Sequence, residues 1–281
     1  MHTKISEQGN IIEVTTLGHR SSGIKIKKIS ADEYVYLETG EICQFENKAD
    51  TRADTKKSLY RTFARLRAIV NTNCTEPEKL RWITLTYAEN MTDRERLYHD
   101  FHDFWLRFKR RWGKAEYIVV AEPQGRGAWH MHLIAIFPDK APFIENSKLR
   151  ECWGFGFVRV TDVKAKNIDN LGAYLSAYLG DVEVGMDEDG EVKIVDGQEK
   201  KFLKGGRLSL YPAGMQIYRH SRGIKQPTEW WVESVDEVGE VVGDATKTFE
   251  KTYECEFEDG FKQVVKKEYY NRIREKGVND C

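Results

Sequence analysis

The segment that most constrains the fold is the apolar run at residues 129–137, which begins with two histidines separated by one residue. Side chains of a β-strand alternate between its two faces, so a strand here places His130 and His132 on the same face of a sheet. Neutral imidazole is a common ligand of divalent metals, and two imidazoles on one rigid strand would form half of a metal site. The same spacing also occurs in strands with a merely polar face, so the histidines need further support.

The preceding residues supply that support. Residues 115–121 form a second apolar run, and residues 124–127 between the two runs contain two glycines. Two strands joined by a short glycine-containing loop form a hairpin. The hairpin brings Glu122 close to His130 across the strand pair, so we predict Glu122 as a third ligand.

Apolar spacing and turn residues predict the remaining elements of the chain. The expected helices cover residues 55–71, 92–112, 146–152 and 167–179. The expected strands cover residues 81–87 and 156–160, and hairpins are expected at residues 23–46 and 250–269. Thr92 and Glu95 have the spacing of a capping box, which predicts that the second helix begins at Thr92.

These elements predict an α+β fold in which a central antiparallel sheet is flanked by helices and carries β-rich elements at both ends. We expect three parts: an N-terminal β-rich extension at residues 1–50, a core at residues 51–181, and an acidic, β-rich C-terminal extension at residues 182–281.

Charge is distributed unevenly along the 281 residues, although the net charge is only −1. Residues 48–126 hold 17 Lys and Arg against 11 Asp and Glu, whereas residues 229–259 hold 2 against 11. The basic middle suits contact with phosphate, and Lys109, Arg110, Arg111 and Arg126 are the candidate DNA contacts.

Several classes of protein lack support in the sequence. The five cysteines are scattered without a C-x-x-C pair, which argues against a disulfide framework or a thiolate zinc site. No apolar run is long enough to span a membrane and no secretory signal is visible, so a cytoplasmic protein is expected. Residues 18–25 lack the Lys-Ser/Thr of a phosphate-binding loop, so no ATP-driven motor is expected.

Tyr174 and Tyr178 lie one turn apart on the predicted helix 167–179, so their rings share a face. Such a pair is found in ordinary cores. Beside a metal site it acquires another meaning, because a cation next to a phosphodiester assists attack by a weakly nucleophilic phenol.

The order of these parts resembles the HUH endonuclease superfamily, and within it the rolling-circle replication initiators of small phages and plasmids with two tyrosines. The matching segments are Ile-Thr-Leu-Thr-Tyr at residues 83–87, the stretch from Glu122 to His132, and Tyr-Leu-Ser-Ala-Tyr at residues 174–178. Tyr-Arg-His-Ser-Arg-Gly at residues 218–223 is also similar to a region downstream of the catalytic helix in phage-type initiators, where we assign it no role.

The resemblance implies an RRM-like palm in which His130, His132 and Glu122 hold Mg²⁺ or Mn²⁺. It further implies that Tyr174 and Tyr178 nick single-stranded DNA at a replication origin through a 5′-phosphotyrosine intermediate and later rejoin the strand. The expected partners are therefore origin DNA, a helicase and a polymerase.

One residue departs from the family pattern. Many relatives have a lysine three residues after the first tyrosine, where this chain has Ala177. The departure leaves open which tyrosine attacks first, with Lys164 and Lys166 as candidate replacements for the missing charge. The alternatives are a relaxase or transposase of the same superfamily, and a non-catalytic RRM-like module that binds nucleic acid.

Overall fold

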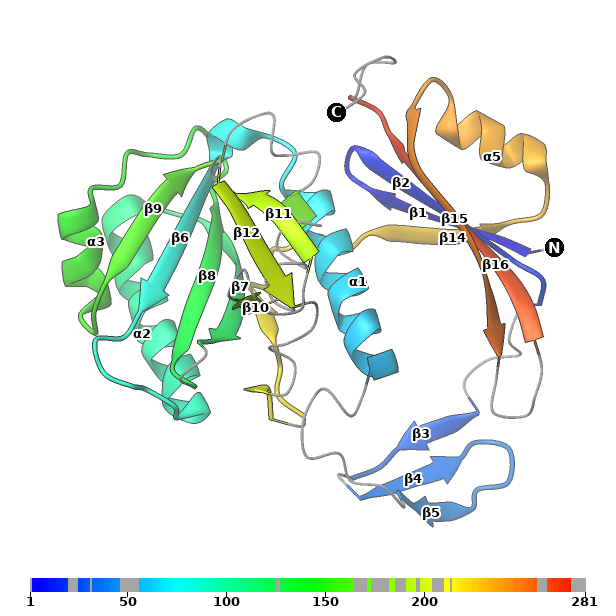
Figure 1. Ribbon diagram of the computed structural model, residues 1–281, viewed down its shortest axis with the longest axis horizontal. Helices are drawn as coiled ribbons and strands as arrows, with labels where there is room; N and C mark the ends of the chain where they lie inside the picture. The colour runs from blue at the N-terminus through cyan, green and yellow to red at the C-terminus, as the bar shows by residue number, and fades with distance from the viewer. Residues whose placement is uncertain are drawn as a thin grey trace.

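Five antiparallel strands form the central sheet, in the spatial order β13-β7-β8-β6-β9 (Figure 1). Their bounds are Leu80–Thr86 for β6, Glu116–Pro123 for β7, Trp129–Ile136 for β8, Val158–Asp162 for β9 and Tyr218–His220 for β13. The computed structural model describes residues 2–19, 25–30, 32–45, 56–124, 127–163, 171–172, 182–184, 191–195, 198–203, 210–212, 214–256 and 262–273. Strands β7 and β8 form the predicted hairpin, and both are buried along most of their length, which explains their apolar sequences.

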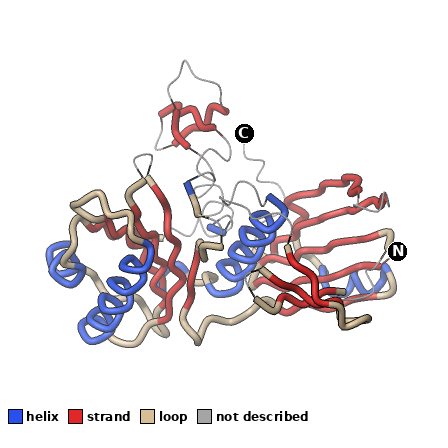
Figure 2. Tube along the Cα trace, turned by 90° about the horizontal axis from the view of Figure 1, so that it is seen from below, coloured by secondary structure: helices blue, strands red, loops and turns tan. Residues whose placement is uncertain are grey.

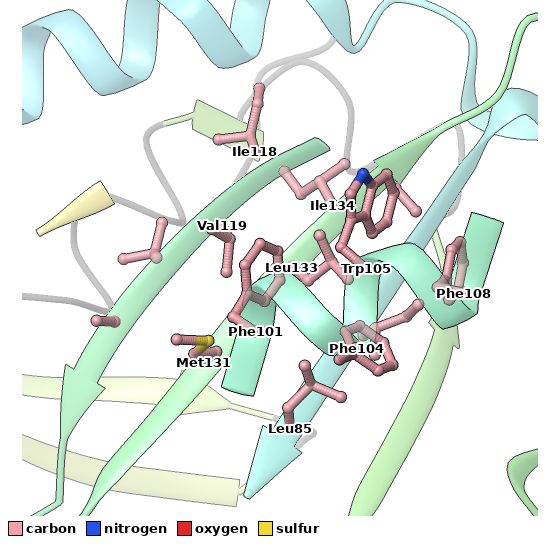
Figure 3. Close-up of a cluster of buried hydrophobic side chains, with 14 of the residues drawn as sticks. Leu85, Phe101, Phe104, Trp105, Phe108, Ile118, Val119, Met131, Leu133 and Ile134 are labelled. Carbon is pink, nitrogen blue, oxygen red and sulfur yellow. The ribbon is translucent and has the colours of Figure 1, made fainter. Parts of the chain in front are cut away.

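Helices α2 (Arg94–Trp112) and α3 (Asn146–Trp153) cover one face of this sheet (Figure 1). The apolar stripe of α2 packs onto the strands, as Figure 3 shows for Phe101, Phe104, Trp105 and Phe108 against Leu85, Met131 and Leu133. Phe104 and Phe108 are completely buried, and burial of each contributes roughly 2 kcal/mol. The position of α2 is therefore fixed by its helical spacing of aromatic residues.

The start of α2 differs from the prediction by one residue. The N-cap is Asp93, whose Oδ1 accepts hydrogen bonds from the backbone N–H groups of Glu95 at 2.8 Å and Arg96 at 3.1 Å. The predicted capping box at Thr92 was wrong because the neighbouring carboxylate satisfies the free N–H groups of the first turn instead.

Helix α1 (Lys56–Asn73) lies between the central sheet and a second sheet (Figures 1 and 2). Its Asn71 Nδ2 donates to Gln8 Oε1 at 3.1 Å, which ties it to the N-terminal hairpin. Asn73 exchanges two hydrogen bonds of 2.9 Å with the backbone of Lys225, which ties it to the segment after β13. Helix α1 thus connects both sheets.

The second sheet, here called the terminal sheet, combines strands from both ends of the chain (Figure 2). Its order is β14-β1-β2-β16-β15, with bounds Thr228–Val232, His2–Gln8, Ile11–Leu17, Lys262–Asn271 and Thr246–Glu256. Helix α5 (Val235–Val242) packs on one face, over a small core of Ile5, Ile12, Val14 and Val232. The N-terminal hairpin therefore lies inside the sheet, with C-terminal strands on both sides.

Two three-stranded sheets complete the described residues. Strands β3 (Ile26–Lys28), β4 (Glu33–Tyr36) and β5 (Ile42–Gln44) confirm the strands expected within residues 23–46. The other sheet contains β10 (Val182–Val184), β11 (Glu191–Val195) and β12 (Gln198–Leu203). A single 3₁₀ turn at Pro77–Lys79 leads into β6.

The predicted α+β class with a central antiparallel sheet is confirmed. Of the predicted helix at residues 167–179, the structure describes only Leu171 and Gly172, both helical, and Leu171 is buried in the main core. Among the described cysteines, Cys43, Cys74, Cys152 and Cys255 are free thiols. No helix in the described part of the chain is long and apolar enough to cross a membrane.

Candidate metal centre

Strand register places the two histidines and Glu122 on one face of the central sheet. Glu122 lies directly opposite His130 across the β7–β8 pair, as the hairpin predicted. His132 lies opposite Val120 on β7 and opposite Thr84 on β6. Paired residues share a face, so this side of the sheet, here called the histidine face, is the one opposite α2.

Glu122 and His132 contact each other directly. His132 Nε2 and Glu122 Oε2 are hydrogen-bonded, and both side chains are almost completely buried. Thr84 Oγ1 lies 3.4 Å from His132 Nδ1. A neutral imidazole has one N–H, so a proton on Nε2 lets it donate to Glu122 while Nδ1 accepts from the Thr84 hydroxyl.

Burial also determines the charge of His132. It lowers the pKa of the imidazole to about 4, because a charged ring is poorly solvated inside the protein. The ring is therefore neutral near pH 7, which is the form that binds metal. Trp82 covers one side of it, with ring centroids 5.9 Å apart.

His130 completes the group from a more open position. Its side chain is half-buried, and its ring centroid lies 5.8 Å from that of His132. Two imidazoles and one carboxylate are donors that suit a divalent cation, so the residue types fit the implied Mg²⁺ or Mn²⁺.

The spacing of these donors is a separate matter from their type. In the part of the chain that the structure describes, no three His, Cys, Asp or Glu side chains are already spaced to hold a metal ion together. The direct hydrogen bond between Glu122 and His132 accounts for this, because each occupies a donor atom of the other. Metal binding would have to replace that contact.

Arg159 is a cation on the same face that the sequence reasoning did not single out. It lies on β9 opposite Thr84, in the same row of paired residues as His132, and its side chain is exposed. The alternation of buried and exposed residues in β9 was the available signal, because Val158 faces the core and Arg159 the other side.

The predicted DNA contacts at the end of α2 do not join this cluster. Lys109, Arg110 and Arg111 occupy the last turn of α2, on the opposite side of the sheet. They precede the first residue of β7, and Glu122 lies roughly 20 Å further along that strand. Arg111 instead pairs with Glu151 of α3 at 3.3 Å.

The remaining predicted site residues lie outside the described residues. These are the candidate nucleophiles Tyr174 and Tyr178, the candidate DNA contact Arg126, the departure at Ala177, and Lys164 with Lys166. Their roles stay predictions.

Comparison with known proteins identifies one family. Residues 80–183 match the family model for replication-associated proteins of the ORF2 type, a range that includes β6 to β9 and all three candidate ligands. No curated protein and no solved structure gave a significant match. The match is consistent with an initiator of rolling-circle replication and implies DNA as a partner. The part of the chain that carries the candidate metal centre is therefore similar to replication-associated proteins of the ORF2 type.

Proposed function

We propose that this protein initiates rolling-circle DNA replication by nicking and rejoining one DNA strand at a specific site. The observation that carries the proposal is the buried Glu122–His132 contact beside His130, within the residues that match the replication-associated family. Burying a carboxylate is costly unless it has a partner, so a purely structural strand gains little from Glu122. A role in chemistry accounts for the cost.

The three residues would hold Mg²⁺ or Mn²⁺. A cation bound there would supply positive charge to the scissile phosphate and stabilise the charge that develops during displacement. The neutral state of His132 and the rigid β7–β8 pair prepare the ligands for this task. Thr84 would keep the His132 ring oriented through Nδ1.

Tyr174 or Tyr178 would then act as the nucleophile. The phenolic oxygen attacks phosphorus, the bond to the 3′ oxygen breaks, and the products are a 5′-phosphotyrosine and a free 3′-hydroxyl that primes a polymerase. The covalent link conserves the phosphodiester bond, so rejoining needs no ATP. Since no motor motif is found in the sequence, we expect a separate helicase to unwind the duplex.

A covalent-adduct assay tests the proposal without knowledge of the origin. The protein is incubated with Mn²⁺ and a library of single-stranded oligonucleotides with a randomised centre. Adducts that survive denaturing electrophoresis are then isolated and sequenced. We expect an enriched sequence motif, no adduct from the Tyr174→Phe/Tyr178→Phe double variant, and an at least tenfold loss with His130→Ala.

A matched control separates chemistry from damage to the protein. Tyr36→Phe alters a partly exposed tyrosine in the β3–β5 sheet and should leave adduct formation unchanged. Adduct formation that persists in the double variant would refute the tyrosine assignment.

A non-catalytic module that binds nucleic acid is the second candidate. The closed hydrogen bond between Glu122 and His132 favours it, because the pair satisfies itself without an ion. In that case the protein would bind single-stranded DNA equally well with Mn²⁺ or with a chelator and would form no adduct.

A further inference from the structure

Two of the six residues of the segment 218–223 have clear structural tasks. Ser221 Oγ accepts a hydrogen bond from the Tyr117 backbone N–H at 2.8 Å, which fixes the end of β13 against β7. Gly223 N–H donates to Glu116 Oε2 at 3.2 Å, and a Cβ at Gly223 would lie 2.4 Å from that carboxylate. These contacts explain Ser221 and Gly223 but not the residues around them.

The other residues of the segment point outward from the sheet. Tyr218 and His220 share the histidine face, with ring centroids 6.4 Å apart and planes inclined by 24°. Both rings are half-buried, so each is held by the protein and keeps an accessible side. Among the described strands, β13 pairs with β7 alone and forms the edge of the sheet.

Arg219 faces the other way and is held flat on an aromatic ring. Its guanidinium carbon lies 3.5 Å from the centroid of the Tyr98 ring. The Tyr98 hydroxyl donates in turn to the Gln216 carbonyl, which fixes the ring. Stacking of this kind orients a guanidinium and leaves its N–H groups free to bind an anion.

Positive charge at this edge is not neutralised locally. Within the described residues, Arg65, Arg219 and Arg222 have no carboxylate at ion-pair distance, and all three are exposed. Arg65 is near enough to act on Tyr218: burial raises the pKa of that phenol, and the Arg65 charge opposes the rise. Cations therefore flank the ring pair.

A hollow of about 680 Å³ opens beside these residues, lined by Thr62 of α1, Tyr117, and residues 216–220. A second hollow shares Gln216 and Arg219 and extends past Tyr98. The edge strand thus has an accessible surface on both of its sides.

We propose that β13 is a binding site for single-stranded DNA, in which Tyr218 and His220 stack on bases while Arg219, Arg222 and Arg65 contact phosphates. The inference rests on the proposed function and names the surface that leads the strand to the candidate metal centre. Tyr218, Val120 and His132 form one row across adjacent strands. Strand spacing puts the backbone of Tyr218 roughly 10 Å from that of His132.

The chemistry favours a single strand over other polyanions. Aromatic rings bind exposed bases, which a duplex keeps stacked internally. A three-residue strand also offers no helix or ribbon that fills a groove. An acidic peptide would use the arginines but would gain little from the rings.

The test measures binding without metal, so that it is independent of nicking. A fluorescent 15-mer oligodeoxythymidine is titrated with the full chain in EDTA, and anisotropy gives the Kd. We expect His220→Ala and Tyr218→Ala each to weaken binding roughly tenfold, and Tyr218→Phe to retain it, because the phenylalanine keeps the ring. Arg219→Gln should reduce the slope of log K against log salt by about 0.7, the value for one phosphate contact.

Controls separate rings from charge. An abasic oligonucleotide of equal length should be insensitive to His220→Ala but sensitive to Arg219→Gln. Phe143→Ala and Arg150→Ala, which alter exposed residues elsewhere, should leave the Kd unchanged. Thermal unfolding of each variant shows that the fold is retained.

Two results would overturn the inference. If the wild-type protein binds the oligonucleotide and the β13 variants bind it equally well, this surface is not the site, although the proposed function stands. If a duplex or polyglutamate of equal charge competes as well as the single strand, the site is not one for bases. Absence of any binding by the wild-type protein would contradict both the inference and the proposed function.

Discussion

A carboxylate and an imidazole buried against each other are unusual in a sheet that is otherwise apolar at this depth. Glu122 and His132 sit among side chains such as Val120 and Ile134, which are fully buried. The pair costs desolvation that an apolar pair would not. Its position beside His130 gives that cost a purpose as a prepared ligand set.

Gly156 is a residue at which close backbone approach can be tested. A Cβ there would lie 2.5 Å from both the Thr86 carbonyl oxygen and the Ala88 nitrogen, and neither backbone atom can move away easily. We expect Gly156→Ala to lower the free energy of unfolding by about 1–3 kcal/mol in urea titrations.

Gly239 provides the matched control for that substitution. It lies within α5 with nothing within 4 Å of an added Cβ. Gly239→Ala should therefore raise stability by up to about 1 kcal/mol through helix propensity. Equal effects of the two substitutions would contradict the packing described around Gly156.

Residue-level prediction from sequence succeeded where the contact was local. The hairpin alone places Glu122 opposite His130, because few residues separate them. The hydrogen bond of Glu122 to His132 could not be predicted, because it depends on side-chain rotamers rather than on register. Arg159 was missed because its pairing with Thr84 joins distant segments.

Among the elements, α2 tests how a helix begins. Asp93 accepts two backbone hydrogen bonds at the N-terminus, whereas Thr92 lies outside the helix. We expect Asp93→Ala to destabilise the protein by about 1 kcal/mol and Thr92→Ala to have a much smaller effect, as measured by chemical unfolding. The reverse ranking would restore the capping box that the sequence suggested.

Element prediction was strongest for long periodic segments and weakest for short ones. The aromatic stripe of α2 and the apolar runs of β7 and β8 identified these elements within about two residues. Strand β13 has only three residues, and its sequence carries no alternation that separates it from a loop. Its position comes from pairing with β7 and from Ser221.

At the scale of the whole molecule, the terminal sheet joins the two ends of the chain. Strand β2 pairs with β1 on one side and with β16 on the other, more than two hundred residues away in sequence. The sequence predicted β-rich elements at both ends but not their union, because periodicity carries no information about which distant strands pair.

An ion pair within this sheet should make its stability depend on pH. Burial alone would raise the pKa of Glu13, but Lys267, at 2.8 Å, and Gln8 hold it below its ordinary value. A lowered acid pKa stabilises the fold above the ordinary pKa, and this stabilisation is lost as the pH falls below about 5. We expect Glu13→Gln to cost about 1–3 kcal/mol at pH 7 and clearly less at pH 3.5, by urea unfolding.

The exposed pair of Lys247 and Glu250 serves as the comparison for that experiment. Both side chains are more than a third exposed, so Glu250→Gln should change stability by less than about 1 kcal/mol at either pH. A Glu13→Gln effect that is independent of pH would contradict the assignment of the pair.

The central claim is that Glu122, His130 and His132 hold a divalent cation, and calorimetric titration with MnCl₂ tests it most directly. The account predicts one Mn²⁺ per chain. It also predicts at least tenfold weaker binding by His130→Ala and by Glu122→Gln, the latter retaining a neutral hydrogen-bonding partner for His132. His99→Ala, which alters an exposed histidine on α2, should bind Mn²⁺ as the wild-type protein does. No binding by the wild-type protein, or binding that these ligand substitutions leave unchanged, would contradict the account.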